Sequence, residues 1–219
     1  MRIAVIGGHG QVALLAAPLL VAAGHEVSSL IRDPAQGADV AATGATPVVA
    51  DVEHLDVEGI AAHLADHDAV VWSAGAGGGD PERTDAVDRD AAIRSMAAAT
   101  SAGADRYVMV SYLGAGPDHG VPTDSSFHAY AEAKAAADEH LRGTDLAWTI
   151  LGPSRLTSDP GTGRIEVGDD LEGSSVARQD VAAVVAAVLE RPGTVRTTIA
   201  FNSGDTPVDE AIDRYVDGG

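Results

Sequence analysis

Short apolar runs alternate along this chain with longer stretches in which apolar residues recur at helical spacing. Runs rich in β-branched residues are typical of strands buried on both faces, and parallel strands need a helix-length connection between them. The alternation therefore predicts an α/β fold, a doubly wound parallel sheet with helices on both faces. The seven candidate strands are residues 2–6, 26–31, 46–50, 69–72, 106–110, 147–151 and 198–201. The candidate helices are residues 11–23, 85–101, 130–142 and 179–190.

Two segments interrupt this alternation. Residues 114–126 and 152–176 are rich in Gly, Pro, Ser and Thr, which predicts long loops with at most one short strand pair. Loops of this length in a compact domain are usually functional. A chain of 219 residues is long enough for one well-buried α/β domain and short for two. We expect a single domain over residues 1–219, in which residues 152–177 form part of a small C-terminal substrate lobe.

The chain is strongly acidic, with 33 acidic and 14 basic residues and a formal net charge of −19. Such a field repels phosphate backbones and anionic membrane surfaces, so we expect no nucleic-acid or membrane partner. No apolar run approaches the roughly 20 residues that a membrane span needs, and the chain begins on a strand-like segment rather than a signal-peptide pattern. The absence of cysteine excludes disulfides and thiol catalysis. We expect a cytoplasmic monomer or homodimer that binds a small molecule.

A glycine-rich turn follows the first candidate strand and leads directly into the first candidate helix. Glycines here allow a tight turn and let the backbone approach a pyrophosphate, which then lies at the positive helix N-terminus. Ala13 supplies the small residue that lets the helix pack on the strand. This strand, turn and helix, followed by a second strand, predict a nicotinamide dinucleotide site. The predicted cofactor-binding residues of the turn are Gly7, Gly8, His9, Gly10, Gln11 and Val12.

The residue after the second candidate strand bears on the choice between NADP and NAD. It is Arg32, and Asp33 follows it. A site selective for NAD usually has an acid here to bind the ribose 2′-hydroxyl, whereas a guanidinium suits a 2′-phosphate. Arg32 therefore favours NADP. NAD remains possible if Asp33 binds the ribose and Arg32 is a solvated surface charge.

Further candidate contacts follow the third and fourth strands. Ligands of open α/β sheets bind beyond the carboxyl ends of the strands. We expect adenine and ribose contacts at these positions, although ordinary turn chemistry is the alternative. The residues are Asp51, Val52, Ser73, Ala74 and Gly75.

Tyr130 and Lys134 are four residues apart in a candidate helix, so both side chains lie on one face. A tyrosine, whose ordinary pKa is about 10, exchanges protons near neutral pH only if a neighbouring cation stabilises its phenolate. Lys134 is the only lysine of the chain, and an ammonium also suits ribose hydroxyls. We predict Tyr130 as the catalytic acid/base, with Lys134 as its electrostatic partner and a cofactor ligand. The alternative is an ordinary amphipathic pair.

A serine is expected to complete this catalytic group. Ser111 ends the fifth candidate strand, where its hydroxyl can polarise a substrate carbonyl. Ser125 or Ser126, in the loop that follows, are the alternatives for this role.

Two weaker patterns receive simpler interpretations. His63 and His67 are four residues apart, but no third ligand accompanies them, so we predict no metal site. Three aspartates near the start of the second candidate helix are interpreted as favourable charges at a helix N-terminus. They are Asp85, Asp88 and Asp90.

Six strings occur in order between residue 2 and about residue 212. They are RIAVIGGHGQVA, LIRDP, DRYVMVS, YAEAK, RQDVAAVVAAVLE and FNSGDTPVDEAI. Together they resemble the NAD(P)-binding, NmrA-like group of atypical short-chain dehydrogenases/reductases, which is epimerase/dehydratase-like. The resemblance implies a Rossmann fold with strand order 3-2-1-4-5-6-7, NADP(H) as the usual cofactor, and reductase or epimerase-like chemistry in some members. It also implies that Pro153 lies in a turn that brings backbone toward the nicotinamide carboxamide. Arg155 departs from the family pattern, in which an arginine often precedes that proline.

These observations predict an NADP(H)-dependent oxidoreductase that transfers hydride to or from a small carbonyl or hydroxyl compound. Two alternatives remain open. One is a non-catalytic NADP(H)-binding redox sensor or regulator, because some members of the resembling group bind the cofactor without known turnover. The other is an epimerase or dehydratase acting on a nucleotide sugar, for which a chain of 219 residues leaves little room.

Overall fold

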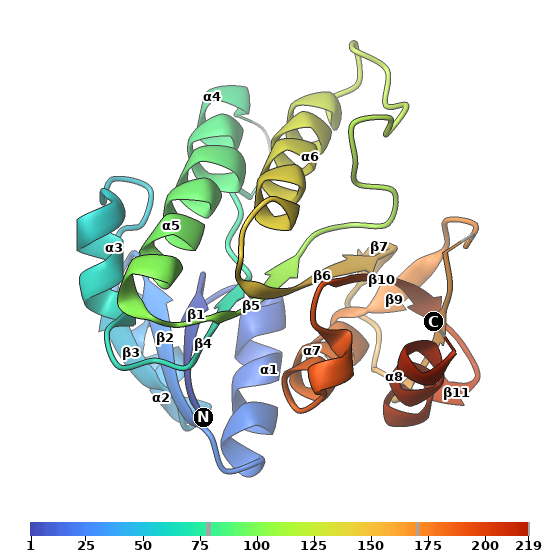
Figure 1. The fold of residues 1–219 in the computed structure, drawn as a ribbon, viewed down its shortest axis with the longest axis horizontal. Coiled ribbons are helices and arrows are strands. Elements are labelled where there is room, and N and C mark those ends of the chain that lie inside the picture. The colour runs from blue at the N-terminus through green and yellow to red at the C-terminus, as the bar shows by residue number, and fades with distance from the viewer. Residues whose placement is uncertain (78–79, 170, 219) are drawn as a thin grey trace.

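The computed structural model describes residues 1–77, 80–169 and 171–218. All seven predicted strands are present and lie parallel to one another in one central sheet. They are β1 (Arg2–Ile6), β2 (Glu26–Ile31), β3 (Thr46–Val49), β4 (Ala69–Trp72), β5 (Arg106–Val110), β6 (Ala147–Pro153) and β10 (Thr197–Ser203). Their spatial order is β3-β2-β1-β4-β5-β6-β10, which confirms the predicted order 3-2-1-4-5-6-7 (Figure 1).

The number of strands is larger than predicted. The additional strands are β7 (Arg155–Thr157), β8 (Arg164–Val167), β9 (Ser175–Ala177) and β11 (Thr206–Pro207). β8 and β11 extend the central sheet beyond β10 in antiparallel pairing, whereas β7 and β9 form a separate parallel pair. The expectation of at most one strand pair in residues 152–176 is therefore wrong, because three strands begin there. Strands of three or four residues between glycines are too short to show a periodic pattern.

Eight α-helices are described, and they include the four predicted segments. They are α1 (Gln11–Ala22), α2 (Gly37–Ala42), α3 (Val57–Leu64), α4 (Pro81–Thr84), α5 (Ala92–Ala102), α6 (His128–Arg142), α7 (Arg178–Leu189) and α8 (Val208–Asp217). A π-helical segment, η2 (Asp85–Ala91), joins α4 to α5, so the predicted helix 85–101 begins with a wider turn. Short 3-10 turns occupy Pro34–Gln36 and Pro192–Thr194.

Helices cover both faces of the central sheet. Ile3 and Val5 of β1 pack into one apolar cluster together with residues of α1 and α7. The alternate residues, Ala4 and Ile6, pack into a second cluster together with residues of α3 and α5. Figure 1 shows α5 and α6 on one side of the sheet and α1 and α7 on the other. Because both faces are buried, the loops at the carboxyl ends of the parallel strands are the natural place for a ligand.

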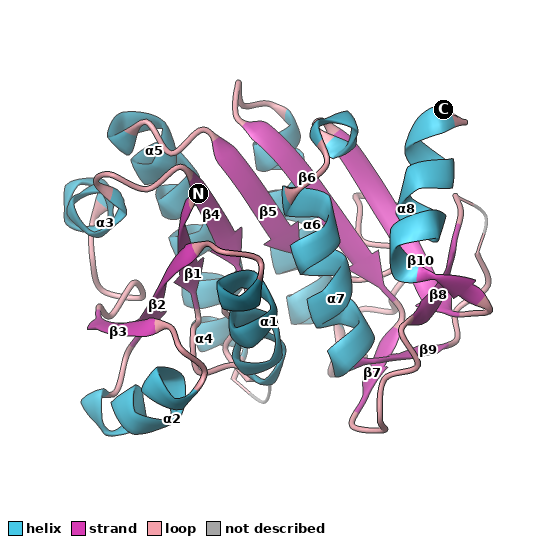
Figure 2. Ribbon diagram, turned by 90° about the horizontal axis from the view of Figure 1, so that it is seen from below, coloured by secondary structure: helices cyan, strands magenta, loops and turns pink. Residues whose placement is uncertain are grey.

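The sheet ends at β3 on one side and at β11 on the other. Each of these outer strands contains a proline, Pro47 in β3 and Pro207 in β11. Figure 2 shows the β7–β9 pair near the end of the sheet toward which β5 and β6 point. In the described residues, no helix combines the length and the apolar character needed to cross a membrane.

Candidate active site

The turn between β1 and α1 requires glycine at two of its positions. Gly7 has a φ of +83°, and a Cβ on it would lie 2.5 Å from the Cα of Ala74. A Cβ on Gly8 would lie 2.5 Å from the Cβ of Ser29. Gly10 precedes α1, and no side chain caps the helix there. The turn therefore brings bare backbone and an uncapped helix N-terminus to the carboxyl edge of the sheet, which is the environment that a pyrophosphate needs.

Three cavities adjoin one another along this edge. The first, of about 220 Å³, contains most of the predicted dinucleotide residues: Gly7, His9, Gly10, Arg32, Asp51, Val52, Ser73, Ala74 and Gly75. The second, of about 240 Å³, shares Gly10 and residues 73–75 with the first and adds Gln11, Val12, Ser111 and Tyr130. The third, of about 520 Å³, shares Ser111 and Tyr130 with the second and adds Pro153. The predicted residues are thus brought into one continuous groove, except that Gly8 packs against Ser29 and Lys134 lies buried beside it.

Two arginines and a glutamate line the first cavity, which we call the adenosine end because the sequence predicts adenine and ribose contacts there. Arg32 Nη1 lies 3.7 Å from Glu53 Oε2, and Arg83 Nε lies 3.2 Å from the same oxygen. Arg32 is half exposed, whereas the Glu53 side chain is 17% exposed. Asp33 does not line the cavity; its carboxylate accepts a hydrogen bond from Ala35 N at 2.9 Å and caps a 3-10 turn.

Other side chains at this end are held by local hydrogen bonds. The His9 ring is 2.9 Å from a carboxylate oxygen of Asp39, so it faces α2. Asp51 accepts a hydrogen bond from Glu53 N at 3.2 Å and contacts the ring of His54 at 3.0 Å. Neither Glu53 nor Arg83 belongs to the motif residues predicted from the sequence.

The predicted catalytic residues meet between β5 and α6. Tyr130 and Ser111 line the second and third cavities together. Lys134 is buried, and its Nζ donates to the carbonyl oxygen of Val110 at 2.9 Å and contacts Met109 Sδ at 3.1 Å. Of the three candidate serines, only Ser111 lines a described cavity. Ser125 accepts a hydrogen bond from Phe127 N near the start of α6.

Two buried carboxylates accompany Lys134. Asp138 lies one helical turn further along α6, and its Oδ2 is 2.5 Å from Ser111 Oγ. Asp88 lies in the π-helical segment and accepts a hydrogen bond from Ala76 N at 3.0 Å. Asp88, interpreted from the sequence as a favourable charge at a helix N-terminus, lies in the first turn of this segment, and the wider turn places it in the interior, 1% exposed. Single π-helical turns are frequent at functional sites.

Burial governs the pKa values of this cluster. Desolvation raises the pKa of Asp138, and Lys134 and the Ser111 hydrogen bond act in the opposite direction. Desolvation also raises the pKa of Asp88, against the hydrogen bond from Ala76. It lowers the pKa of Lys134, against the attraction of both carboxylates.

The pKa of Tyr130 is raised well above its ordinary value, first by burial and then by the charges of Asp88 and Asp138. This direction is opposite to the stabilised phenolate expected from the spacing of Tyr130 and Lys134. A desolvated phenol near two carboxylates is more stable in its neutral form. Tyr130 is therefore held as a protonated group that can donate.

Aromatic rings line one wall of the third cavity. The ring centroids of Tyr112 and Phe127 are 5.2 Å apart in an edge-to-face arrangement, and that of Tyr130 is 5.1 Å from Phe127. Phe127 is 42% exposed, so part of its ring is open to solvent at this cavity. Arg155 and Arg178 also line this cavity.

A comparison with protein families identifies this arrangement. A family model described as NAD(P)H-binding matches residues 7–192. The chain belongs to this NAD(P)H-binding family. Residues 7–192 include the glycine turn, the Tyr130–Lys134 helix and α7.

Full-length relatives share the fold of this NAD(P)H-binding protein. YhfK of Bacillus subtilis, named an uncharacterized sugar epimerase, is 34% identical over 97% of this chain and 99% of the relative. The structure of a Bacillus halodurans protein assigned to the NAD-dependent epimerases/dehydratases has a TM-score of 0.90 and 31% identity, covering 98% and 99% of the two chains. The Lactococcus lactis oxidoreductase ylbE has a TM-score of 0.87 and 24% identity, covering 99% and 97%, and shows the same fold.

These findings confirm the Rossmann fold and fit the predicted resemblance to the NmrA-like group. They assign the chain to a family described as NAD(P)H-binding, and one relative in it, YhfK, is named a sugar epimerase.

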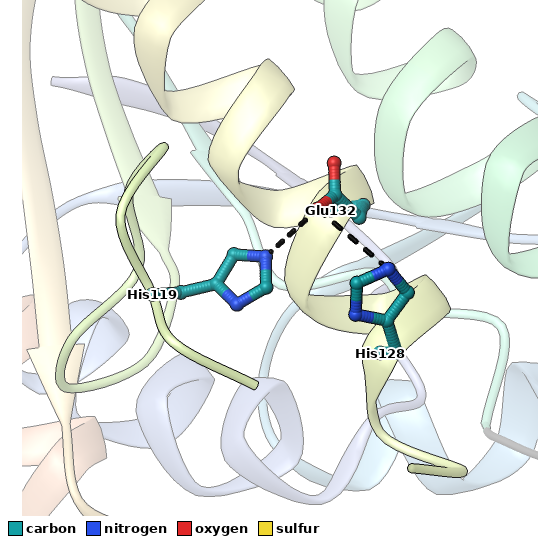
Figure 3. Close-up of side chains that lie close together, drawn as sticks. All are labelled: His119, His128 and Glu132. Atoms are coloured by element: carbon teal, nitrogen blue, oxygen red, sulfur yellow. Dashed lines mark hydrogen bonds and ion pairs between the residues drawn. The ribbon is translucent and has the colours of Figure 1, made fainter. Parts of the chain in front are cut away.

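The NAD(P)H-binding domain also contains a cluster that no local motif predicted. His119 and His128 both approach Glu132, at 3.0 and 3.8 Å (Figure 3). His119 Nδ1 accepts a hydrogen bond from Val121 N, whereas His128 Nδ1 lies 3.0 Å from Val121 O. A neutral His119 must then carry its proton on Nε2, where it donates to Glu132, and this tautomer has no lone pair there for a metal. The contact between His119 and Glu132 instead links the loop after β5 to α6. The four-residue spacing of His128 and Glu132 was the available sequence signal.

Proposed function

We propose that this protein is an NADPH-dependent reductase of small carbonyl compounds. The observation that carries the proposal is the continuous groove, which runs from Arg32 past the glycine turn to Tyr130 and opens into the aromatic-walled cavity. One end of the groove suits a dinucleotide and the other suits a small organic molecule.

The residues present fit NADPH. The bare backbone of residues 7–10 and the uncapped start of α1 suit its pyrophosphate. Arg32 and Arg83, two guanidinium groups in one cavity, suit its 2′-phosphate. Asp33, the residue that would favour NAD, is engaged in capping a turn. Bound NADPH would supply the hydride and leave as NADP⁺.

Tyr130 serves as the proton donor in this proposal. Hydride addition to the carbonyl carbon leaves negative charge on the oxygen, and a neutral phenol can protonate it to give the alcohol. The raised pKa of Tyr130 keeps the phenol protonated at neutral pH, which suits reduction better than alcohol oxidation. Lys134 counters the charge that Tyr130 acquires as it releases the proton.

Ser111 depends on Asp138 for its role. If the carboxylate is ionised, the Ser111 hydroxyl donates to Asp138 and cannot donate to a substrate. If Asp138 holds the proton, it donates to Ser111 Oγ, and the serine hydrogen is free to polarise the carbonyl. Burial raises the pKa of Asp138, which favours the second arrangement. Asp138 is therefore a positioning residue in this scheme.

Calorimetric titration with NADPH and NADH tests the cofactor, and NADPH oxidation with a panel of aldehydes, ketones and quinones tests turnover. We expect NADPH to bind more tightly than NADH, and Arg32→Ala to weaken NADPH binding about tenfold. Tyr130→Phe should reduce turnover by about 10² to 10⁴ while NADPH affinity stays within about twofold. Tyr215→Phe, the same change at a tyrosine of α8 outside the groove, is the matched control and should keep its activity. Failure of both cofactors to bind, or full turnover by Tyr130→Phe, would refute the proposal.

Sugar epimerisation is the second candidate, because YhfK is named a sugar epimerase and the similarity covers 97% of this chain. An epimerase returns the hydride to its substrate, so it consumes no NADPH overall. Inversion of a nucleotide sugar observed by NMR, without loss of NADPH absorbance, would favour this candidate over the reductase.

A further inference from the structure

Two arginines differ from the others in what surrounds them. Of the 13 arginines, eight lie within 4.0 Å of a carboxylate and three others donate to main-chain carbonyl oxygens. Among the described residues, Arg155 and Arg178 do neither; Arg178 Nη1 is 3.2 Å from the hydroxyl of Ser158. In a chain with 33 acidic residues, two arginines without a carboxylate partner are conspicuous. Both line the cavity that contains Tyr130.

The small parallel sheet brings these arginines together. Arg155 is the first residue of β7, and Arg178 is the first residue of α7, directly after β9. In the β7–β9 pair, Arg155 is opposite Ser175 and Thr157 is opposite Ala177. The segment 152–176, which was predicted as a loop, thus contributes to placing two guanidinium groups at one cavity.

The electrostatics of this position are unfavourable without a ligand. Arg178 lies in the first turn of a 12-residue helix, where the helix dipole favours negative charge. No side chain caps that helix, and the carboxylate of Asp180 is already bonded to Thr162 N and Gly163 N. No acidic residue of the described chain lines the cavity. An anion would relieve this uncompensated positive charge and bind both guanidinium groups.

Most of the remaining surface of the cavity is apolar. The rings of Tyr112, Phe127 and Tyr130 pack against one another and face it. A planar apolar group would bury part of the exposed Phe127 ring, and stacking with aromatic rings adds to the affinity.

We propose that this cavity binds a carbonyl compound with a planar apolar body and an oxyanion, either carboxylate or phosphate, held by Arg155 and Arg178. The inference rests on the proposed reductase function, because it places the carbonyl next to Tyr130. Arg178 also lines the second cavity, so it can contact the cofactor as well, whereas Arg155 lines the third cavity only. Arg155 is therefore the more specific reporter.

The test measures binding of three matched probes to the NADP⁺-saturated protein by calorimetry, a state in which no reduction occurs. The probes are 4-formylbenzoate, its neutral amide 4-formylbenzamide, and 4-formylphenyl phosphate. We expect the acid, the phosphate or both to bind at least about tenfold more tightly than the amide, and the tighter of the two identifies the oxyanion. Arg155→Ala should abolish the preference and leave NADP⁺ affinity within about twofold. Arg155→Lys should retain part of it, because the charge remains and the fork is lost.

Arg214→Ala removes one exposed positive charge from α8, outside this cavity, and should leave the preference unchanged. Equal binding of acid, phosphate and amide, or a preference that survives in Arg155→Ala/Arg178→Ala, would overturn the inference while leaving the reductase proposal intact. Failure of NADP⁺ to bind would overturn both.

Discussion

The two ends of the groove treat positive charge differently. At the adenosine end, Arg32 and Arg83 share the carboxylate of Glu53, so the site is nearly balanced before any ligand arrives. At the other end, in the third cavity, Arg155 and Arg178 have no carboxylate partner among the described residues. The cation that does have carboxyl groups near it is the buried Lys134, which Asp88 and Asp138 attract. A 2′-phosphate must compete with Glu53 for its arginines. An anionic substrate would meet guanidinium groups that are not already paired.

The buried cluster should give the largest effect when its balance is broken. Lys134→Met removes the ammonium and leaves the buried carboxylate of Asp88 without a counter-charge, whereas Asp138, protonated in the proposed mechanism, needs none. We expect a loss of about 3–5 kcal/mol in the free energy of unfolding at neutral pH, together with loss of turnover. Urea unfolding followed by circular dichroism measures the stability.

The sign of the pH dependence follows from Lys134, whose charge acts to lower the pKa values of Asp88 and Asp138. Without that charge, both groups of the folded variant take up protons at a higher pH than those of the folded wild type. The loss of stability of Lys134→Met relative to the wild type is therefore smallest in acid, and it grows as pH rises through the pKa values of the two groups in the folded variant. An unfolding midpoint equal to that of the wild type at neutral pH would contradict the picture of a charge-balanced core.

Two substitutions of Asp138 distinguish the effect of its hydrogen bond to Ser111 from the effect of its charge. Asp138→Asn can donate to Ser111 Oγ as a protonated carboxyl does, so turnover should fall by no more than about tenfold. Asp138→Ala leaves Ser111 without its partner, and we expect a loss of about 10² in turnover.

The pH profile provides a second readout for this pair. Because the wild type needs Asp138 protonated, its reductase rate should fall as pH rises through the raised pKa of that group. The Asn variant should lack this decline. Equal losses in the Asn and Ala variants, or an unchanged pH profile in Asp138→Asn, would remove Asp138 from the mechanism.

The smallest effect is expected at the adenosine end. Glu53→Gln removes the carboxylate that competes with a 2′-phosphate, so the ratio of NADPH to NADH affinity should rise about threefold to fivefold, the range expected for a partly exposed ion pair. Calorimetry with both cofactors measures the ratio, and Glu58→Gln, a change of the same type on α3, serves as the control. A fall in the ratio would mean that Glu53 supports NADPH binding instead of opposing it.

What the sequence could predict depends on how locally each feature is encoded. The glycine turn, the strand ends and the Tyr130–Lys134 pair are each specified by residues close together in the chain, and the structure brings them to one groove. Asp138 had a signal of the same kind, since it is four residues beyond Lys134. No sequence signal indicated the buried position of Asp88. That position depends on a π-helical turn, whose hydrogen bonds leave no periodic pattern in the sequence.

The other residues of the groove are far apart in the sequence and are brought together only by the fold. Glu53 and Arg83 are 30 positions apart and meet only because the segments that follow β3 and β4 lie at the same edge of the sheet. Arg155 and Arg178 line one cavity because β7 pairs with β9, two strands of three residues each. A strand of three residues is too short to show an alternating pattern in the sequence, so the segment around these strands was predicted as a loop.

The prolines of β3 and β11 bear on how copies of this protein can associate. An outer strand normally presents a row of unpaired N–H and C=O groups that can template a strand from another molecule. Pro47 and Pro207 each delete one donor from such a row, and they do so at both margins of the same sheet. The chain thus resists edge-to-edge aggregation at each boundary, and copies that assemble in solution would do so through helices or loops.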